Sequence, residues 1–572
     1  MKGQAFQKVL CLSGNRGRGI AVDDIGANTT CVERNRMKNF RKIIVVLLIL
    51  VMALSLFACN KKEPSGGTPG GGRSPDDADW VSYTIGIGNY LGRFLAGINP
   101  AEDLSGCDAV FDTVFRTNLE TREVFSYILK NWYWEDDVTL ICEMREDVFF
   151  SNGDNATAED LIFSYFNHVE RGSNFLNDFG MDWDRTVVRD KYTAQFGLYE
   201  PFPGFFNSPF YLIDKAWSLE VGWDSMEWYN PVGSGPYYVY DYVADSYMVL
   251  RSRGDDYWYK DEGPIVVDEW ILKYYPDSAT LYMALEVGDV DIASVSSANY
   301  SRFLQTGGDG FEVEMSPDGT TVYFVFSMHP EDGADYWNDI RLREAVAIGV
   351  DWDKVGQLAM GDMYMKAYSV APKSSPDFID PGQYVFDPDR ARELMAEAGY
   401  GPNNPLRITT STMDNPMNKN AYEAFLFYAA DIYIDAHVEF KDVSAALGDW
   451  LNPGNTDYGL FYNETGSVTR EVRACIFDCY TPEGVTYTYV PDPDLLEQFN
   501  ILLRSTDAAA VTAAGKWCQQ YFFDTFQYIP IFELTSAVGW RTDKFSEAQV
   551  MNYRVYTDNY QISRLGLASA WK

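Results

Sequence analysis

Strand-like and helix-like stretches alternate from about residue 80 to about residue 540, and this alternation constrains the fold more than any other feature. Tyr83–Gly88 is typical of a strand, and capped helices are expected to begin at Thr157, Asp277, Asp387 and Asp492. Apolar residues follow these caps at helical spacing, which predicts that they face a core. They are Ala158, Leu161, Ile162, Tyr165, Phe166 and Val169; Leu281, Ala284 and Leu285; Ala391, Leu394, Met395 and Ala398; and Leu495, Leu496, Phe499, Leu502 and Leu503. The alternation predicts α/β layering.

The N-terminal part contains an apolar run, Ile43–Ala58, which follows Lys38, Arg41 and Lys42 and leads into Cys59. A basic region followed by an apolar run and a small residue predicts a secretory signal peptide. The run is slightly short for a bilayer-spanning helix of about 20 residues. Its ending, Leu-x-Ala-Cys, resembles the lipobox of bacterial lipoproteins, which implies that Cys59 carries the lipid (palmitate) and becomes the mature N-terminus. The alternative is a plain N-terminal anchor, and either would hold the chain on the extracytoplasmic face of the cell membrane.

The segments around this signal can be assigned from their composition. Residues 1–36 are interpreted as an over-extended gene start, because a signal peptide does not normally follow a long polar leader. Residues 37–58 then form the lipoprotein signal peptide. Residues 59–79 are rich in Gly, Pro, Ser and Asp and are expected to form a flexible tether. The folded part is expected to begin near Trp80.

The charge of the chain excludes some partners. The formal net charge is −37, and the first 58 residues contain nine basic and three acidic residues, so the mature chain is more negative still. Such a charge disfavours binding to nucleic acid and to anionic lipid surfaces, which need cationic contacts. A well-solvated secreted surface explains most of it.

Five cysteines remain after the signal peptide and Cys59 are set aside, which is an odd number for an oxidising compartment. They are Cys107, Cys142, Cys475, Cys479 and Cys518. Cys475 and Cys479 are close enough in the sequence for a small disulfide. At most two pairs can form.

Seven sequence blocks, in a fixed order, resemble one protein family. They are Val148–Gly153 running into Thr157–Ser164, Pro231–Tyr237, Asp256–Trp258, Ala284–Ala293, Arg341–Val346, Val350–Asp351, and Phe386–Pro388 through Ala398–Tyr400. The order is similar to that of the extracytoplasmic solute-binding proteins of ABC importers, family 5, the group that takes oligopeptides, dipeptides and nickel. The blocks themselves are structural, since Gly233, Gly235 and Pro236 predict a turn.

The resemblance implies a two-lobed α/β fold of the periplasmic-binding-protein type (type II, the large family 5 variant), with two interlobe crossings. Residues 80–315, completed by 530–572, would form the first lobe, and residues 316–529 the second. The protein would capture a solute in the interlobe cleft by hinge closure and deliver it to the permease and ATPase subunits of an ABC importer. We expect a monomer that is not an enzyme and that needs no cofactor or metal.

The ligand class follows from the resemblance as well. Family members take short peptides as extended strands, although some take nickel complexes, opines or sugars. In peptide-binding relatives, the strand after an Asp-Tyr-Asp element carries aromatic residues and an acid that pairs with the peptide's amino group. Asp457–Gly459 occupies that place here, so Glu464 is the expected acid, and the alternative is a core Phe461 with a solvated Glu464. The expected ligand-contact residues are Phe461, Tyr462, Asn463, Glu464, Asn89 and Tyr90.

An enzyme is the main alternative class. The chain has only His168, His329 and His437, lacks a G-x-S-x-G elbow, and contains neither H-E-x-x-H nor C-x-x-C. A secreted glycoside hydrolase needs only a pair of carboxylates, and hydrolysis of chromogenic glycosides would favour it. A surface adhesin is the third class. Importer permease and ATPase genes beside this gene would exclude it.

Overall fold

The computed structural model divides the chain into two units, residues 1–68 and 69–572, and only the second contains described residues. The structure describes residues 79–550 except for 89–93, 95–106, 118–123, 171–179, 203–204, 206–209, 262–263, 327–334, 376, 443–444, 447–459, 467–471, 473–491 and 548. The predicted gene start, signal peptide and lipidated Cys59 lie outside this part, as do Asn89, Tyr90, Cys475 and Cys479.

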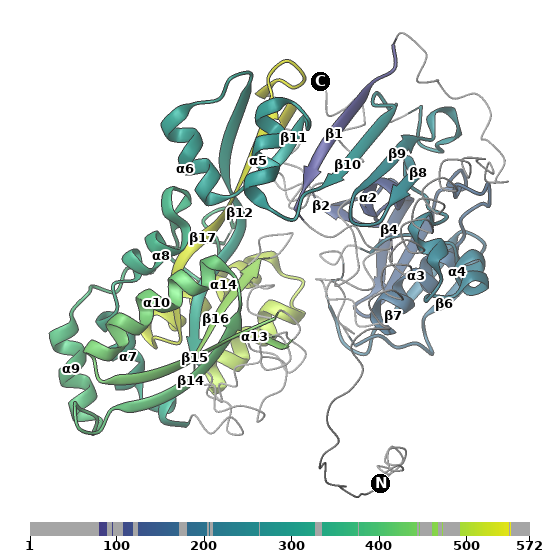
Figure 1. Cartoon of the computed structure of the whole chain (residues 1–572). Helices are drawn as coiled ribbons and strands as arrows, with labels where there is room; N and C mark the ends of the chain where they lie inside the picture. Colours follow the sequence, from purple (N-terminus) through teal and green to yellow (C-terminus); the bar gives the residue numbers. More distant parts are fainter. Residues whose placement is uncertain are drawn as a thin grey trace, which may run out of the picture. The chain divides into compact units, whose positions relative to one another are not determined.

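One large mixed sheet organises the described part of the chain (Figure 1). Its strand order is β16-β12-β17-β11-β1-β10-β9-β8, and β13 pairs with β17. β1 runs parallel to β10 and β11, while the other pairs are antiparallel. The strands are β1 (Ser82–Ile87), β8 (Tyr237–Val243), β9 (Tyr247–Ser252), β10 (Glu269–Tyr274), β11 (Ile292–Val295), β12 (Phe311–Phe326), β13 (Met365–Lys366), β16 (Leu460–Gly466) and β17 (Tyr528–Arg541). The strand predicted at Tyr83–Gly88 is confirmed as β1.

The long strands β12 and β17 connect the two parts of this sheet. The first half of β12 pairs with the end of β17, which in turn pairs with β11. The second half of β12 pairs with β16. These two strands are therefore the two crossings of a two-lobed fold. The predicted boundary between residues 315 and 316 falls inside β12, and the exact lobe limits stay a prediction.

The first part of the chain adds two small antiparallel sheets to the large one. The order of the larger is β4-β5-β7-β6, and β2 pairs with β3. The strands are β2 (Arg116–Thr117), β3 (Val124–Phe125), β4 (Leu129–Asp136), β5 (Thr139–Met144), β6 (Val187–Asp190) and β7 (Thr193–Gly197). The helices are α2 (Cys107–Val110), α3 (Ala158–Glu170), α4 (Lys215–Val221), η2 (Met226–Tyr229), η3 (Gly254–Asp256), α5 (Ser278–Val287) and α6 (Ser297–Thr306).

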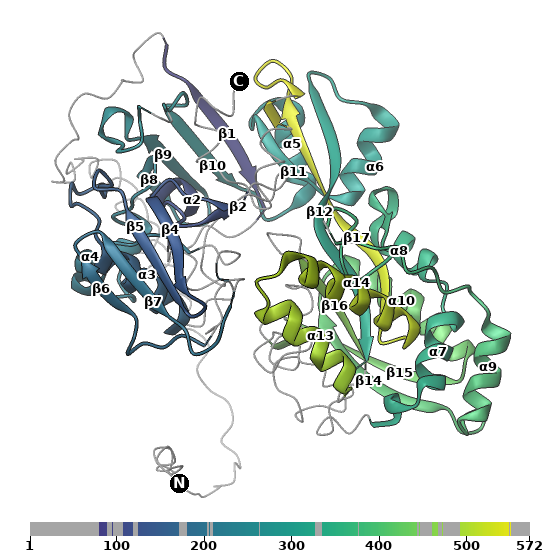
Figure 2. The ribbon, with the colours of Figure 1, turned by 180° about the vertical axis from the view of Figure 1, so that it is seen from behind.

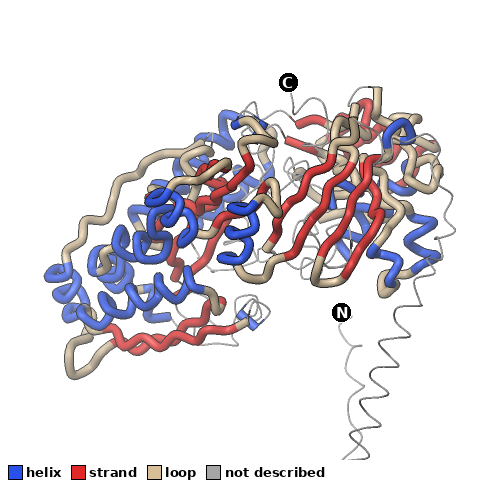
Figure 3. The backbone as a smooth tube through the Cα atoms, turned by 45° about the horizontal axis from the view of Figure 1, so that its top comes forward, coloured by secondary structure: helices blue, strands red, loops and turns tan. Residues whose placement is uncertain are grey.

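The later part of the chain contains a two-stranded parallel sheet formed by β14 (Leu406–Met413) and β15 (Ile434–Lys441). Figure 2 shows these strands below the helices of this part, and Figure 3 shows the same helices in blue over red strands. The helices are η4 (Asp335–Asn338), α7 (Ile340–Gly349), α8 (Trp352–Met360), η5 (Gly361–Met363), α9 (Pro388–Glu397), α10 (Pro416–Asp431), α13 (Pro493–Arg504) and α14 (Ala508–Asp524).

The predicted helix starts are confirmed by their hydrogen bonds. Asp277 accepts a bond from the Thr280 backbone N–H at 2.7 Å, and Asp387 accepts one from Arg390 at 3.0 Å. Asp492 accepts a bond from the backbone N–H of Asp494 at 2.9 Å. Each bond satisfies one of the N–H groups that a helix start leaves without a partner.

Two residues predicted to be core are instead exposed, so the prediction is wrong at these positions. Leu496 of α13 is 48% exposed and Phe166 of α3 is 39% exposed. On α13, Leu495, Phe499 and Leu502 are buried against α14 and the large sheet. A residue one step further along a helix is turned by about 100°, so Leu496 points away from that face.

Two of the family blocks lie against each other and explain the glycines of Pro231–Tyr237. The backbone N–H of Ser151 donates to the carbonyl oxygen of Gly233 at 2.8 Å, and Gly235 donates to that of Val110 at 2.8 Å. A Cβ atom on Gly233 would lie 2.0 Å from the Val110 carbonyl oxygen, which no side chain can do. Gly233 must be glycine because another stretch of backbone approaches it this closely.

Arg253, which follows β9, is a buried arginine that ties these segments together. Its guanidinium donates to five carbonyl oxygens: those of Ser234 (3.2 Å), Gly235 (3.1 Å), Phe149 (3.3 Å), Phe150 (3.2 Å) and Asp256 (3.0 Å). Asp112 is buried nearby and accepts hydrogen bonds from Trp258 Nε1 at 3.1 Å and from the Tyr257 hydroxyl at 3.3 Å. Burial raises the pKa of Asp112 to about 6, although the charges of Arg116 and Arg253 oppose this shift.

His168 of α3 is buried and uncharged. Its ring packs against Phe210, and neither ring nitrogen has a hydrogen-bond partner among the described residues. Burial lowers its pKa to about 3. A histidine in an unfolded chain titrates near about 6.5, so the unfolded state binds the proton first as the pH falls. The contribution of His168 to stability is therefore complete above about pH 6.5 and is lost progressively below it.

Acidification from pH 7 to pH 5 is expected to lower the unfolding free energy by about 2 kcal/mol through His168. His168→Leu should remove this part of the pH dependence, whereas His437→Gln, at an exposed position, should keep it. Urea unfolding of the three proteins at both pH values measures the difference. Asp112 titrates in all three and has the opposite sign, so the comparison isolates His168. An unchanged pH dependence in His168→Leu would contradict the prediction.

Cys107, Cys142 and Cys518 are buried thiols. Burial raises the pKa of Cys142 and of Cys518 far above the ordinary value. Thiols that stay protonated are poor nucleophiles, so these two cysteines are structural.

Candidate functional site

The predicted ligand residues Phe461, Tyr462, Asn463 and Glu464 lie together on β16. In its antiparallel register with β12, Phe461 is opposite Val325, Tyr462 opposite Phe324, Asn463 opposite Tyr323, and Glu464 opposite Val322. The other two predicted residues, Asn89 and Tyr90, follow the end of β1 and lie outside the described residues.

β16 stands at one end of the strand order of the large sheet. Among the strands that the structure describes, it pairs only with β12. Its partner residues Val322, Tyr323, Phe324 and Val325 are all buried, so β16 rests on a well-packed strand. β14 also lies close to β16, although the two strands do not pair among the described residues.

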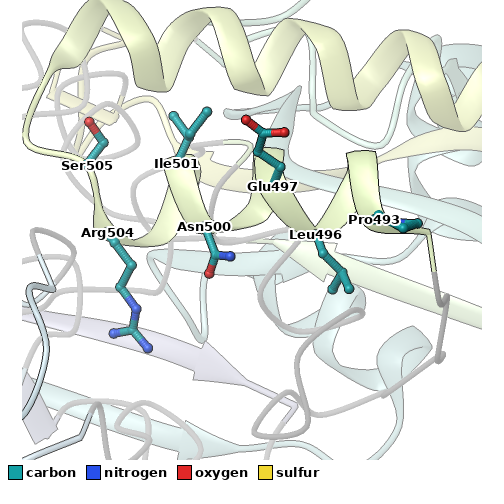
Figure 4. Close-up of a pocket in the computed structure, with 7 residues that line it drawn as sticks. All are labelled: Pro493, Leu496, Glu497, Asn500, Ile501, Arg504 and Ser505. Carbon is teal, nitrogen blue, oxygen red and sulfur yellow. The ribbon is translucent and has the colours of Figure 1, made fainter.

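A groove of about 630 Å³ runs along α13 (Figure 4). It is lined by Pro493, Leu496, Glu497, Asn500, Ile501, Arg504 and Ser505. Leu496, Asn500 and Arg504 are four residues apart and project from the same side of the helix in Figure 4.

Arg504 contacts a segment of the chain that is distant from α13 in the sequence. Its Nη2 lies 3.0 Å from Oε2 of Glu200, and its Nη1 donates to the carbonyl oxygen of Pro201 at 3.4 Å. Pro201 is 303 residues away in the sequence.

The start of α13 is fixed by Asp492 and Tyr521. The Tyr521 hydroxyl donates to Asp492 Oδ2 at 2.6 Å, and this hydrogen bond holds the pKa of Asp492 below its usual range. Tyr521 lies on α14, which packs on the buried face of α13. The hydrogen bond at Asp492 and the packing of α14 on the buried face therefore fix the position of α13 and of the side chains that line the groove.

Sequence reasoning did not identify the groove or the Arg504 contact. The helix was predicted from Asp492 and its apolar spacing, but nothing local in the sequence marks Glu200 as the partner of Arg504. The exposed Leu496 was the available signal, because an apolar residue on the solvent face of an amphipathic helix often marks a contact surface.

The described residues contain no group of three or more His, Cys, Asp or Glu side chains that could hold a metal ion. No helix among the described residues is both long and apolar enough to span a bilayer.

Solved structures share this fold. NikA from Brucella suis, solved in complex with Fe(III)-EDTA, superimposes with a TM-score of 0.71 at 19% identity, covering 85% of this chain and 99% of NikA. The oligopeptide-binding protein AppA from Bacillus subtilis, solved in complex with a nonapeptide, has a TM-score of 0.66 at 16% identity, covering 85% and 98%. The fold is therefore the two-lobed fold of the periplasmic binding proteins.

Sequence comparison gives the family. A protein of Brucella ovis, provisionally named an ABC transporter peptide-binding protein, is 29% identical over 70% of this chain and 73% of its own length. Bacillus subtilis AppA is 21% identical over 64% of this chain and 68% of its own length. The pattern of the bacterial extracellular solute-binding proteins, family 5, matches residues 124–471. The chain belongs to this family of bacterial extracellular solute-binding proteins.

Proposed function

We propose that this protein binds short peptides outside the cytoplasm and delivers them to the permease and ATPase subunits of an ABC importer. The observation that carries the proposal is the match of residues 124–471 to the family 5 solute-binding proteins, a stretch that includes Phe461–Glu464 on β16. A peptide bound as an extended strand would be held largely through backbone hydrogen bonds. Backbone pairing is independent of side chains, so one site can accept many sequences.

The names of the relatives support a peptide ligand. The Brucella ovis protein and AppA are both named for peptide binding, and AppA was solved with a nonapeptide. NikA was solved with an iron chelate instead, so a metal chelate is the alternative ligand class that a binding experiment should include.

Calorimetry of the purified protein with a library of di- to nonapeptides tests the proposal. We expect saturable binding of at least some peptides and none of Fe(III)-EDTA, nickel salts or sugars. Binding of a chelate or sugar with no binding of any peptide would overturn the peptide ligand while leaving the solute-binding family intact.

We further propose that residues 80–315 with 530–572 close against residues 316–529 when the ligand is bound, and that Asn89 and Tyr90 contribute from the first lobe. Ligand contacts that exist only in the closed arrangement would shift the population toward it. Small-angle scattering should give a smaller radius of gyration at ligand saturation. An unchanged profile at saturation would argue for a rigid cleft.

Membrane attachment through Cys59 is proposed from the lipobox. Stable attachment to a bilayer needs more than one acyl chain, and the lipidated cysteine of a lipoprotein supplies them. Cys59→Ala is expected to move the protein from the membrane fraction to the soluble or retained precursor fraction and to abolish labelling with a fatty-acid analogue. Cys475→Ala serves as the control and should label normally. Labelling that persists in Cys59→Ala would reject the assignment.

A further inference from the structure

The contact between Arg504 and Glu200 joins segments that the predicted lobe limits place in different lobes. Glu200 lies in the segment that follows β7, and Arg504 lies in the last turn of α13. Neither residue belongs to β12 or β17, through which the chain crosses between the two parts of the large sheet. The contact is therefore separate from the covalent connection of the lobes.

We propose that the Glu200–Arg504 pair is a latch that stabilises the closed arrangement of the two lobes, including in the absence of ligand. The proposal rests on the lobe closure proposed above, but it does not depend on which ligand the protein binds. In this arrangement the side chain of Arg504 also forms one end of the groove along α13.

The geometry suits a latch because the arginine makes two contacts. One nitrogen faces the Glu200 carboxylate at 3.0 Å while another reaches the Pro201 carbonyl oxygen at 3.4 Å. A planar guanidinium that donates to two neighbouring acceptors fixes orientation as well as distance. The buried face of α13 and its anchored start at Asp492 hold the helix backbone that presents Arg504.

The exposure of the pair sets the size of its effect. The side chains of Arg504 and Glu200 are 39% and 66% exposed, so water and salt weaken their attraction. An exposed ion pair of this kind shifts an equilibrium by at most about fivefold. A protein that must both close on its ligand and release it needs open and closed states of similar free energy, so a fivefold shift changes the populations measurably.

Removing either charge is expected to open the unliganded protein. In small-angle scattering at low ionic strength, Glu200→Gln and Arg504→Gln should show a larger radius of gyration than the wild type. The wild type should expand toward the same value at high salt, whereas the two variants should respond little. The exchanged pair Glu200→Arg with Arg504→Glu should restore the smaller radius.

Glu159→Gln is the matched control, because Glu159 pairs with Lys215 at 2.8 Å with exposures of 62% and 38%, and the predicted lobe limits place both residues in the first lobe. It should leave the radius unchanged. If the single variants keep the wild-type radius, or the exchanged pair fails to restore it, the latch is wrong. Where a peptide binds, its affinity should fall by up to about fivefold in the single variants. If no peptide binds, the proposed ligand fails while the scattering result still decides the latch.

Discussion

Replacing Arg253 by methionine is expected to lower the unfolding free energy by about 3–5 kcal/mol. Methionine has a similar length but no donor, so the carbonyl oxygens of Gly235, Phe149 and Asp256 would lose the donor that Arg253 provides. Those of Ser234 and Phe150 would keep only their second donors, Trp258 Nε1 and the Gly153 N–H, each at 3.0 Å. Each buried acceptor left without a donor costs about 1–3 kcal/mol, and relaxation recovers part of the sum. Asp112 would also lose one of the two cations, Arg116 and Arg253, that oppose the rise in its pKa.

Urea unfolding of Arg253→Met beside the wild type measures this loss. Arg302→Met is the control, because Arg302 forms an exposed ion pair with Glu286 and its loss should cost at most about 1 kcal/mol. Arg253→Lys should also be strongly destabilised, since a single ammonium cannot reach carbonyl oxygens on three segments of backbone. A loss below about 1 kcal/mol in Arg253→Met would mean that water or rearranged backbone replaces the guanidinium.

Arg253 also shows where sequence reasoning stops. The residue types at Gly233 and Gly235 predicted a turn, and the structure has an isolated bridge at Gly233 followed by a bend. The reason for these glycines, a carbonyl oxygen of Val110 within 2.0 Å of a Cβ on Gly233, depends on a segment more than a hundred residues earlier. A buried arginine that bonds to carbonyl oxygens leaves no pattern either, because its partners are backbone atoms that every residue carries.

The helices could be predicted because their caps are local features, whereas their contacts depend on distant segments of the chain. Asp277, Asp387 and Asp492 were identified as caps because a cap acts over three residues. On α13, the prediction of burial was correct for Leu495 and Phe499 and wrong for Leu496. The neighbouring elements set how wide the buried side of a helix is, so its limits cannot be predicted from spacing alone. The ion pair between Arg504 and Glu200 depends on tertiary structure alone.

The candidate site was predicted only through the resemblance to the family. That resemblance placed Phe461–Glu464 on the strand after an Asp-Tyr element, and the structure has this segment as β16 at the end of the sheet. The place of β16 in the strand order could not be predicted from the residues themselves. The alternation of side chains along a sequence can predict a strand. The place of β16 in the sheet depends on its pairing with β12, which lies more than a hundred residues earlier.

Glu464→Ala is expected to weaken the binding of peptides with a free α-amino group by about 30- to 3,000-fold. This range corresponds to about 2–5 kcal/mol, the usual cost of leaving a charge unpaired in a closed site. The expectation rests on the prediction, taken from the family resemblance, that Glu464 pairs with the amino group of a bound peptide. A carboxylate shielded from water stabilises an ammonium more strongly than one in bulk solvent.

Acetylated peptides turn this expectation into a test of the pairing itself. N-acetylation removes the positive charge, so it should weaken binding to the wild type by a factor similar to that of the Glu464→Ala substitution. The same acetylation should have little effect on binding to Glu464→Ala, because the partner is already missing. Glu393→Ala, on the exposed face of α9, controls for a general loss of negative charge and should bind both forms as the wild type does. If acetylation weakens binding equally in the wild type and in Glu464→Ala, another group holds the amino terminus, and Glu464 is a solvated residue of β16.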